Sequence, residues 1–145
     1  MAVLQIITGA NTPVLRKKTE IIPKVTKEIK KLIKDMKETV PAEKGAGLAA
    51  PQVGVSLRLS ICMLDGKYEA IINPKILWKS EETTIDEEGC LSLPNIWLNI
   101  KRHNEIILNY LDEKGKTHEK KYSGFDARVI QHEVDHLDGV LIVDY

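Results

Sequence analysis

Three residues near the C-terminus, His132, Glu133 and His136, have the types and spacing of a metal site with a neighbouring base. Residues four apart lie on one face of a helix, so the two imidazoles can reach the same ion. Glu133 points to one side of that face, where its carboxylate can act on water without binding the ion. The pattern is short and also occurs by chance. The residues alone leave two interpretations open, a hydrolytic metal site and an ordinary polar helix.

Cys90 is the favoured third ligand, because a catalytic ion usually has three protein ligands and one open position. It lies in EEGCLSLP, between acidic residues and a turn-prone segment, which is less suited to a packing role. A thiolate lowers the net charge of the site and binds a soft divalent ion well. Gly89, beside it, allows close backbone approach.

Other histidines and carboxylates are less favoured as the third ligand. His103 and His118 lie in polar, strand-like stretches, and we expect both at the surface. Asp135 is on the same helix as the histidine pair but turned away from it. An ion pair with Arg102 is its expected role.

Two helical patterns must position these residues. The first covers about residues 26–39, with Thr26 as its cap and Pro41 as its end. Its apolar side chains recur at helical spacing: Ile29, Leu32, Ile33, Met36 and Val40. The second begins after Gly124 and stops at Gly139. Its apolar stripe consists of Ala127, Ile130, Val134 and Leu137.

The segments between the helices are mostly strand-like. Strands are expected over residues 57–64, 68–78, 98–102, 104–111 and 116–122, and a last short strand over 140–143. Residues 112–115 are expected to form a hairpin turn, and residues 44–55 a loop rich in Gly and Ala. The chain up to Pro23 is expected to be an extended arm with a turn at 9–13.

A block of strands with one helix at each end predicts an α+β fold. We expect a mostly antiparallel sheet packed around the C-terminal helix, with an N-terminal helix, in a single domain over 1–145.

Composition gives no reason to propose a nucleic-acid or membrane partner. Lys plus Arg number 21 and Asp plus Glu number 21. No apolar run approaches the roughly 18 residues that span a bilayer. The start, MAVLQIITGA, lacks the basic and long apolar regions of a signal peptide. We expect a cytoplasmic protein with reduced cysteines, of which Cys62 packs in the core.

Three segments together resemble the motifs of the peptide deformylase family. They are GAGLAAPQ (45–52), EGCLS (88–92) and QHEVDHL (131–137), and the likeness covers nearly the whole chain. The resemblance implies an enzyme that removes the formyl group from the N-terminal formyl-methionine of newly made polypeptides. It implies that Cys90, His132 and His136 bind one divalent ion. That ion is expected to be Fe²⁺, with Zn²⁺, Ni²⁺ or Co²⁺ able to substitute.

The same resemblance implies roles for residues around the ion. Glu133 is expected to take the proton of the attacking water and to deliver it to the departing amine. Negative charge then develops on the former carbonyl oxygen. The side chain of Gln52 and the backbone N–H of Leu91 are the implied donors to that oxygen.

The substrate is implied to be an N-formylmethionyl peptide that adds to the protein as a strand. Gly45, Ala46 and Gly47 are expected to pair with its main chain, although Gly45 could instead only shape a turn. The walls around the methionine are expected from Val129, the ring of His132, Leu48 and Leu91, with close approach at Gly89.

Three positions bear on substrate preference. Ala46 replaces a larger aliphatic residue usual in the family and could widen the mouth of the site. Trp97 replaces an Arg found in some relatives and favours stacking or apolar contact. Arg128 is expected to be solvated rather than to meet the carboxyl end of the peptide.

Other functions stay open from the sequence alone. They are hydrolysis of another small N-acyl group, a non-catalytic metal-bound fold, and a thiol enzyme with Cys90 as nucleophile. Glu133 and Gln52 argue against the non-catalytic fold, since a protein that only binds needs no base. A monomer is expected, and a contact with the ribosome is left open.

Overall fold

A computed structural model describes residues 3–145 of the chain. Its helices are α1 (Pro13–Arg16), α2 (Lys27–Ala42) and α3 (Gly124–Leu137), with short 3₁₀ helices η1 (Ala50–Val53) and η2 (Ile142–Asp144). Its strands are β1 (Gly47–Ala49), β2 (Leu59–Leu64), β3 (Lys67–Lys79), β4 (Thr83–Cys90), β5 (Leu93–His103), β6 (Glu105–Leu111) and β7 (Thr117–Ser123).

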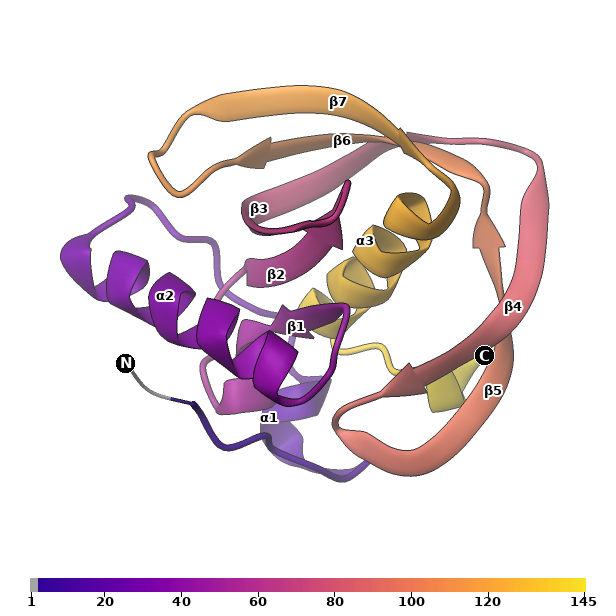
Figure 1. The fold of residues 1–145 in the computed structure, drawn as a ribbon, viewed down its shortest axis with the longest axis horizontal. Coiled ribbons are helices and arrows are strands. Elements are labelled where there is room, and N and C mark those ends of the chain that lie inside the picture. The colour runs from indigo at the N-terminus through magenta and orange to yellow at the C-terminus, as the bar shows by residue number, and fades with distance from the viewer. Residues whose placement is uncertain (1–2) are drawn as a thin grey trace.

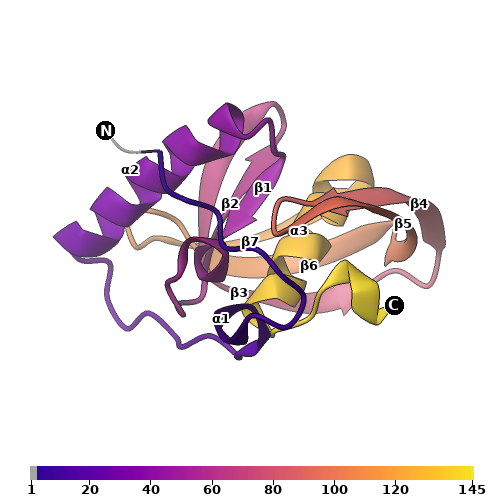
Figure 2. The same ribbon diagram turned by 90° about the horizontal axis from the view of Figure 1, so that it is seen from below.

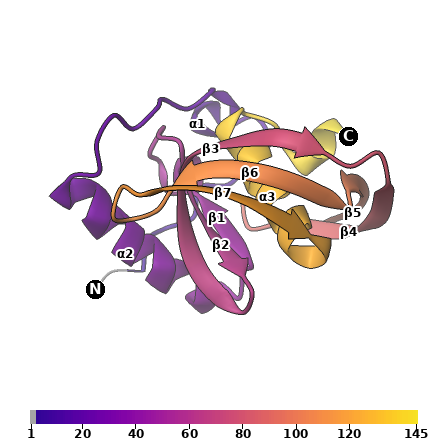
Figure 3. The same ribbon diagram turned by 90° about the horizontal axis from the view of Figure 1, so that it is seen from above.

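Helix α3 lies near the centre of the molecule, between two sheets (Figure 1). One sheet has five strands in the order β1-β2-β3-β6-β7, and the other is the pair β4-β5. All pairings within these sheets are antiparallel. Strands β3, β6 and β7 cross over α3 (Figure 3). The predicted α+β fold with a mostly antiparallel sheet around the C-terminal helix is confirmed.

The core lies on both faces of the larger sheet, because β2 is buried on both sides. Leu59 and Ile61 pack in the cluster that includes Met36 of α2. Cys62 and Leu64 pack in the cluster that includes Val129 and Ile130 of α3. Side chains alternate along a strand, so β2 separates α2 from α3 (Figure 2). Cys62 is fully buried, which confirms its predicted place in the core.

Helix α2 begins where the sequence predicts and ends later. Thr26 Oγ1 accepts a hydrogen bond from the Ile29 backbone N–H at 3.3 Å, which caps the first turn. The helix includes Pro41 and ends at Ala42, so the prediction that Pro41 ends it is wrong. Pro41 has no N–H to donate, so the last turn loses one hydrogen bond, and the helix continues for only one more residue. The N–H of Glu43 still bonds to Thr39 O at 3.0 Å.

Four other expectations from the sequence are corrected. Residues 83–90, which were not expected to be a strand, form β4. The N-terminal arm contains α1, and the final segment is the 3₁₀ helix η2 rather than a strand over 140–143. The loop over 44–55 contains β1 and η1. In short segments, pairing with distant residues decides the conformation more than local propensity does.

The hairpin and the C-terminal helix agree with the sequence. Gly115 has a φ of +81° in the turn between β6 and β7, and Gly139 has a φ of +75° just after α3. Within residues 3–145, none of the helices combines the length and the apolar composition needed to traverse a lipid bilayer.

Candidate metal centre and active site

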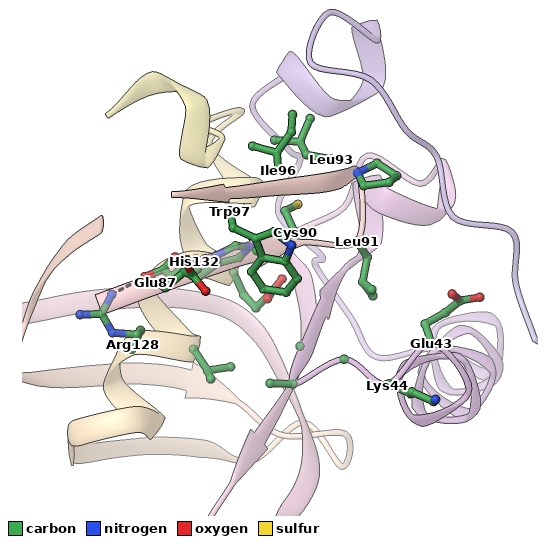
Figure 4. Close-up of a pocket in the computed structure, with 18 of the residues that line it drawn as sticks. Glu43, Lys44, Glu87, Cys90, Leu91, Leu93, Ile96, Trp97, Arg128 and His132 are labelled. Carbon is green, nitrogen blue, oxygen red and sulfur yellow. Dashed lines mark hydrogen bonds and ion pairs between the residues drawn. The ribbon is translucent and has the colours of Figure 1, made fainter. Parts of the chain in front are cut away.

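The three predicted ligands come together where β4 ends against α3. Figure 4 shows two of them, Cys90 and His132, in the wall of the neighbouring cavity. Cys90 Sγ lies 3.4 Å from His136 Nε2, which lies 3.2 Å from His132 Nε2. All three ligand atoms lie within 4.8 Å of one another. Tetrahedral coordination with bonds of about 2.0–2.3 Å places ligand atoms about 3.3–3.8 Å apart. The sulfur and the two nitrogens therefore fit a single divalent ion.

The fold brings Cys90 to α3 through a distortion of β4. The register between β4 and β5 shifts between Gly89 and Cys90. Such an irregularity bends a strand and redirects the next side chain. Gly89 pairs with Trp97, and a Cβ atom at Gly89 would collide with the indole ring. A glycine is required there for the two strands to approach this closely.

Glu88 holds His132 in place, and the sequence reasoning missed it. His132 Nδ1 lies 2.8 Å from Glu88 Oε1, so the N–H at Nδ1 donates and the lone pair of Nε2 faces the other ligands. Arg102 donates to the same carboxylate through Nε and Nη2, both at 2.9 Å. Arg128 Nη1 donates to Oε2 at 2.6 Å. The one available signal was that Glu88 opens the EGCLS motif.

These contacts set the charges of the centre. Burial opposes ionisation of Glu88, but hydrogen bonds from Arg102 and His132 outweigh it and lower its pKa to about 2. Burial also opposes the charged form of His132, but hydrogen bonds to Cys90 and Glu88 raise its pKa to about 10. Burial, followed by the charge of His132, lowers the pKa of His136 well below its usual value. A proton and an ion compete for the same imidazole nitrogen, so binding of an ion releases that proton.

Glu133 is a buried carboxylate in the wall of the cavity. It is 3% exposed, and its Oε1 has no hydrogen-bond partner among residues 3–145. A Cβ atom at Gly47 would lie 2.5 Å from Glu133 Oε2, so only a glycine leaves room for the carboxylate beside β1. Burial raises the pKa of Glu133 to about 7. A group that titrates near neutral pH is suited to both accepting and donating a proton.

Gln52 presents its amide N–H groups toward the ligand cluster. Its Oε1 accepts from the Ala49 backbone N–H at 2.9 Å, which fixes the orientation of the amide. Its Nε2 lies 3.1 Å from Ser92 Oγ and 3.8 Å from Cys90 Sγ. Ser92 is fully buried and was not identified from the sequence. The neighbouring Leu91 is half-buried in the cavity wall.

A cavity of about 640 Å³ opens beside these residues. Nine of the predicted site residues line it: Gly45, Ala46, Gly47, Gly89, Cys90, Leu91, Val129, His132 and Glu133. Leu48 differs, because its side chain is fully buried in the cluster under α2. Leu48 can therefore contact a peptide only through its backbone.

Two exposed aromatic side chains form part of the same wall, and the sequence indicated only one of them. Trp97 of β5 is 64% exposed and Phe125 of α3 is 63% exposed. Leu93 and Ile96 add apolar surface, and the charged Glu43 and Lys44 lie beyond Leu91 at the end of α2 (Figure 4). The mouth of the cavity is thus apolar on the side of β5.

Other polar residues have structural partners. Arg102 Nη1 donates to Asp135 Oδ2 at 2.6 Å, which confirms the predicted pair. His103 and His118 are half-buried rather than fully exposed, and neither belongs to the ligand cluster. The prediction that Arg128 is solvated is wrong. Besides Glu88, it donates to the backbone oxygens of Thr84 at 2.7 Å and Ile100 at 3.0 Å.

Comparison with known proteins gives one consistent result. The family model described as polypeptide deformylase matches residues 4–145. A peptide deformylase of Pseudothermotoga lettingae is 49% identical over 132 residues, which are 91% of this chain and 77% of that protein. The crystal structure of peptide deformylase from Thermotoga maritima has a TM-score of 0.96 at 42% identity, covering 99% of this chain and 97% of that one. A peptide deformylase from Synechococcus elongatus, crystallised in complex with actinonin, has a TM-score of 0.94 at 35% identity, covering 99% and 79%.

Proposed function

The chain belongs to the polypeptide deformylase family, metal-dependent hydrolases that remove the N-formyl group from newly made polypeptides, and we propose how its residues perform that reaction. In this proposal Cys90, His132 and His136 hold one divalent ion, and Glu133 moves the protons. The observation that carries it is the buried carboxylate of Glu133 in the cavity wall, beside the cluster of one thiol and two imidazoles.

The proposed ion is Fe²⁺, with Zn²⁺, Ni²⁺ and Co²⁺ able to take its place. One thiolate and two imidazoles form a donor set that suits all of these ions. When bound, the ion acts as a Lewis acid that polarises the carbonyl and makes water more acidic. The Nδ1–H of His132, held by Glu88, keeps its ring oriented for this task.

Glu133 is proposed to carry one proton through the reaction. Its carboxylate takes a proton from water as the water oxygen bonds to the formyl carbon. The same group then gives that proton to the nitrogen as the carbon–nitrogen bond breaks. The products are formate and a peptide whose methionine has a free amine. A pKa of about 7 supports both steps, because neither protonation state is strongly disfavoured at neutral pH.

Gln52 and Leu91 are proposed to bind the oxygen on which negative charge develops. The contacts of Gln52 with Ala49 and Ser92 keep its Nε2 turned toward the ligand cluster before any substrate arrives. The backbone N–H of Leu91 is the second proposed donor. Removing one preorganised donor of this kind typically lowers the rate by about 10² to 10³.

The peptide is proposed to bind along β1. This strand is at the edge of the larger sheet, and Gly45, Ala46 and Gly47 lie on the cavity wall. An extended peptide can add to such an edge by main-chain hydrogen bonds, which leaves most of its side chains free to vary. The proposed walls for the methionine are Val129, the ring of His132, Gly89 and Leu91. Actinonin, present in the structure of the Synechococcus elongatus relative, is expected to occupy this cavity.

The residues after the methionine are proposed to meet the apolar mouth formed by Ile96, Trp97 and Phe125. Exposed aromatic rings favour stacking and apolar contact. We therefore expect faster reaction with peptides whose second or third residue is apolar than with peptides carrying an acidic residue there.

We further propose that residues 1–145 act as a single catalytic domain and as a monomer in the cytoplasm. Newly made formylated chains arise in that compartment, and its reducing conditions keep Cys90 free of disulfides.

The test is release of formate from a formyl-methionyl peptide by protein purified without oxygen, with the matched acetyl-methionyl peptide as a second substrate. The proposal expects formate release that stops when a chelator removes the ion, and little hydrolysis of the acetyl peptide. Equal hydrolysis of both peptides would point to another N-acyl substrate. Full activity after ion removal would point to a thiol nucleophile.

A further inference from the structure

Tyr145 is outside the cavity wall, yet its hydroxyl is part of the network behind His132. It donates to Asp135 Oδ2 at 2.6 Å and accepts from Arg102 Nη1 at 3.0 Å. Arg102 Nη1 also donates to Asp135 Oδ2 at 2.6 Å, so the three side chains form a closed triangle of hydrogen bonds. The guanidinium carbon of Arg102 lies 4.9 Å from the centre of the Tyr145 ring, within cation–π distance.

The triangle connects to the ion site through a single buried arginine. Arg102 is 4% exposed, and its Nε and Nη2 grip both oxygens of Glu88 at 2.9 Å. Glu88 Oε1 also receives the Nδ1–H of His132 at 2.8 Å. A chain of three hydrogen-bonded contacts thus leads from Tyr145 through Arg102 and Glu88 to His132.

The planar guanidinium makes this connection stiff. Its donors point in fixed directions, so fixing Nη1 also fixes the direction of Nε and Nη2 toward Glu88. The side chain of Asp135 is 25% exposed, and water there competes for its carboxylate. The Tyr145 hydroxyl fills one acceptor site of that carboxylate and accepts one N–H of Arg102. Without the hydroxyl, Arg102 Nη1 keeps only its contact with Asp135, whose carboxylate is open to water.

We propose that Tyr145 is a positioning residue of the ion site. Its hydroxyl holds Arg102 in the plane that grips Glu88, and Glu88 in turn aims the Nε2 of His132. Ion affinity and the geometry around the ion therefore depend on a hydroxyl that touches neither the ion nor the substrate. This inference rests on the proposed ligand set of Cys90, His132 and His136.

The experiment compares Tyr145→Phe with Tyr110→Phe. Both substitutions remove only a phenolic hydroxyl, and that of Tyr110 bonds instead to the hydroxyl of Tyr122 at 3.1 Å. Any purification tag is placed at the N-terminus. The readouts are the dissociation constant for Co²⁺, from competition with a chelator, and the visible absorption of the bound Co²⁺.

Substituting a group that directly supports a metal ligand weakens ion binding by about 10 to 100-fold. Tyr145 acts one residue farther away, so Tyr145→Phe is expected to weaken Co²⁺ binding by about 3 to 10-fold and to shift the absorption bands. Tyr110→Phe is expected to leave both readouts at the wild-type values. Equal affinities and spectra for the two variants would overturn the inference and leave Tyr145 a packing role.

A second variant tests the route through Arg102. Asp135→Asn removes the carboxylate that both Arg102 and Tyr145 contact. The double variant combines Tyr145→Phe with Asp135→Asn. If Tyr145 and Asp135 both act through Arg102, it weakens Co²⁺ binding by less than the product of the two single effects. Independent effects would contradict the proposed route.

The variant Cys90→Ser distinguishes a failure of the proposed ligand set from a failure of the proposed role of Tyr145. If it binds Co²⁺ as tightly as the wild type, the ligand set fails. If it loses Co²⁺ while Tyr145→Phe does not, only the role of Tyr145 fails.

Discussion

Two buried carboxylates near the ion site, Glu88 and Glu133, have opposite pKa shifts. Glu88 is surrounded by Arg102, Arg128 and His132, and their hydrogen bonds overcome the effect of burial. Glu133 has no comparable set of donors, so burial dominates and its pKa rises to about 7. Environments that separate the pKa values of two neighbouring acids also separate their roles. At the scale of residues, Glu88 is a fixed charge that orients a ligand, and Glu133 is free to exchange a proton.

Replacing Glu133 by Gln is expected to lower turnover by orders of magnitude and to leave the ion bound. The amide has the same size but cannot accept a proton from water, and general-base catalysis contributes about 10² to 10⁴-fold. Formate release should fall by that factor, while elemental analysis still finds one ion per chain. A variant that retains activity within a few-fold of the wild type would remove Glu133 from the mechanism.

Replacing Glu88 by Gln is expected to destabilise the fold. It leaves the buried guanidinium of Arg128 without a counter-charge and Arg102 with Asp135 alone, and breaking a buried ion pair from one side costs about 3–5 kcal/mol. Unfolding in urea measures this change. The control is Glu87→Gln at the exposed neighbouring position, where about 0.5 kcal/mol or less is expected. Equal unfolding midpoints for the two variants would contradict the structural role of Glu88.

At the scale of elements, periodic segments could be predicted from the sequence and segments defined by distant partners could not. Helix α3 has an apolar stripe and a terminal glycine, both of which are local signals. Strand β4 has no such signal, because residues 83–87 are all exposed and mostly polar. Its conformation comes from pairing with β5. The role of Glu88 was hidden for the same reason, since Arg102 and Arg128 lie 14 and 40 residues away in sequence.

In strand β1, one added methyl group should impair catalysis and leave binding of the ion intact. Gly47→Ala places a Cβ 2.5 Å from Glu133 Oε2, so either the edge strand or the carboxylate must move. Formate release is expected to fall at least tenfold with the ion retained, since a misplacement of about 1 Å can lower a rate by about 10²-fold. In Gly45→Ala the nearest atom is Leu91 Cδ1 at 3.1 Å, the end of a flexible side chain, and a milder loss is expected. The reverse order of the two variants would contradict the placement of Glu133 against β1.

For the whole molecule, the ion should act as a crosslink between the two sheets. One proposed ligand comes from β4 of the smaller sheet, and two come from α3, which packs against the larger sheet. An ion that binds only the folded state stabilises it by about 2.7 kcal/mol when its concentration is 100 times the dissociation constant. Chelation should therefore lower the thermal midpoint, and added Zn²⁺ should restore it. Cys90→Ser should respond much less to either treatment. An unchanged thermal midpoint of the wild-type protein after chelation would show that the ion does not join these elements.

The most direct test of the ion site is X-ray absorption at the edge of the bound ion, because it counts the donor atoms. With Zn²⁺ bound, we expect one sulfur neighbour at about 2.3 Å and nitrogen or oxygen neighbours at about 2.0–2.1 Å. The sulfur signal should disappear in Cys90→Ser. A spectrum without sulfur in the wild-type protein, or an unchanged sulfur signal in that variant, would contradict the ion site from which the proposed chemistry follows.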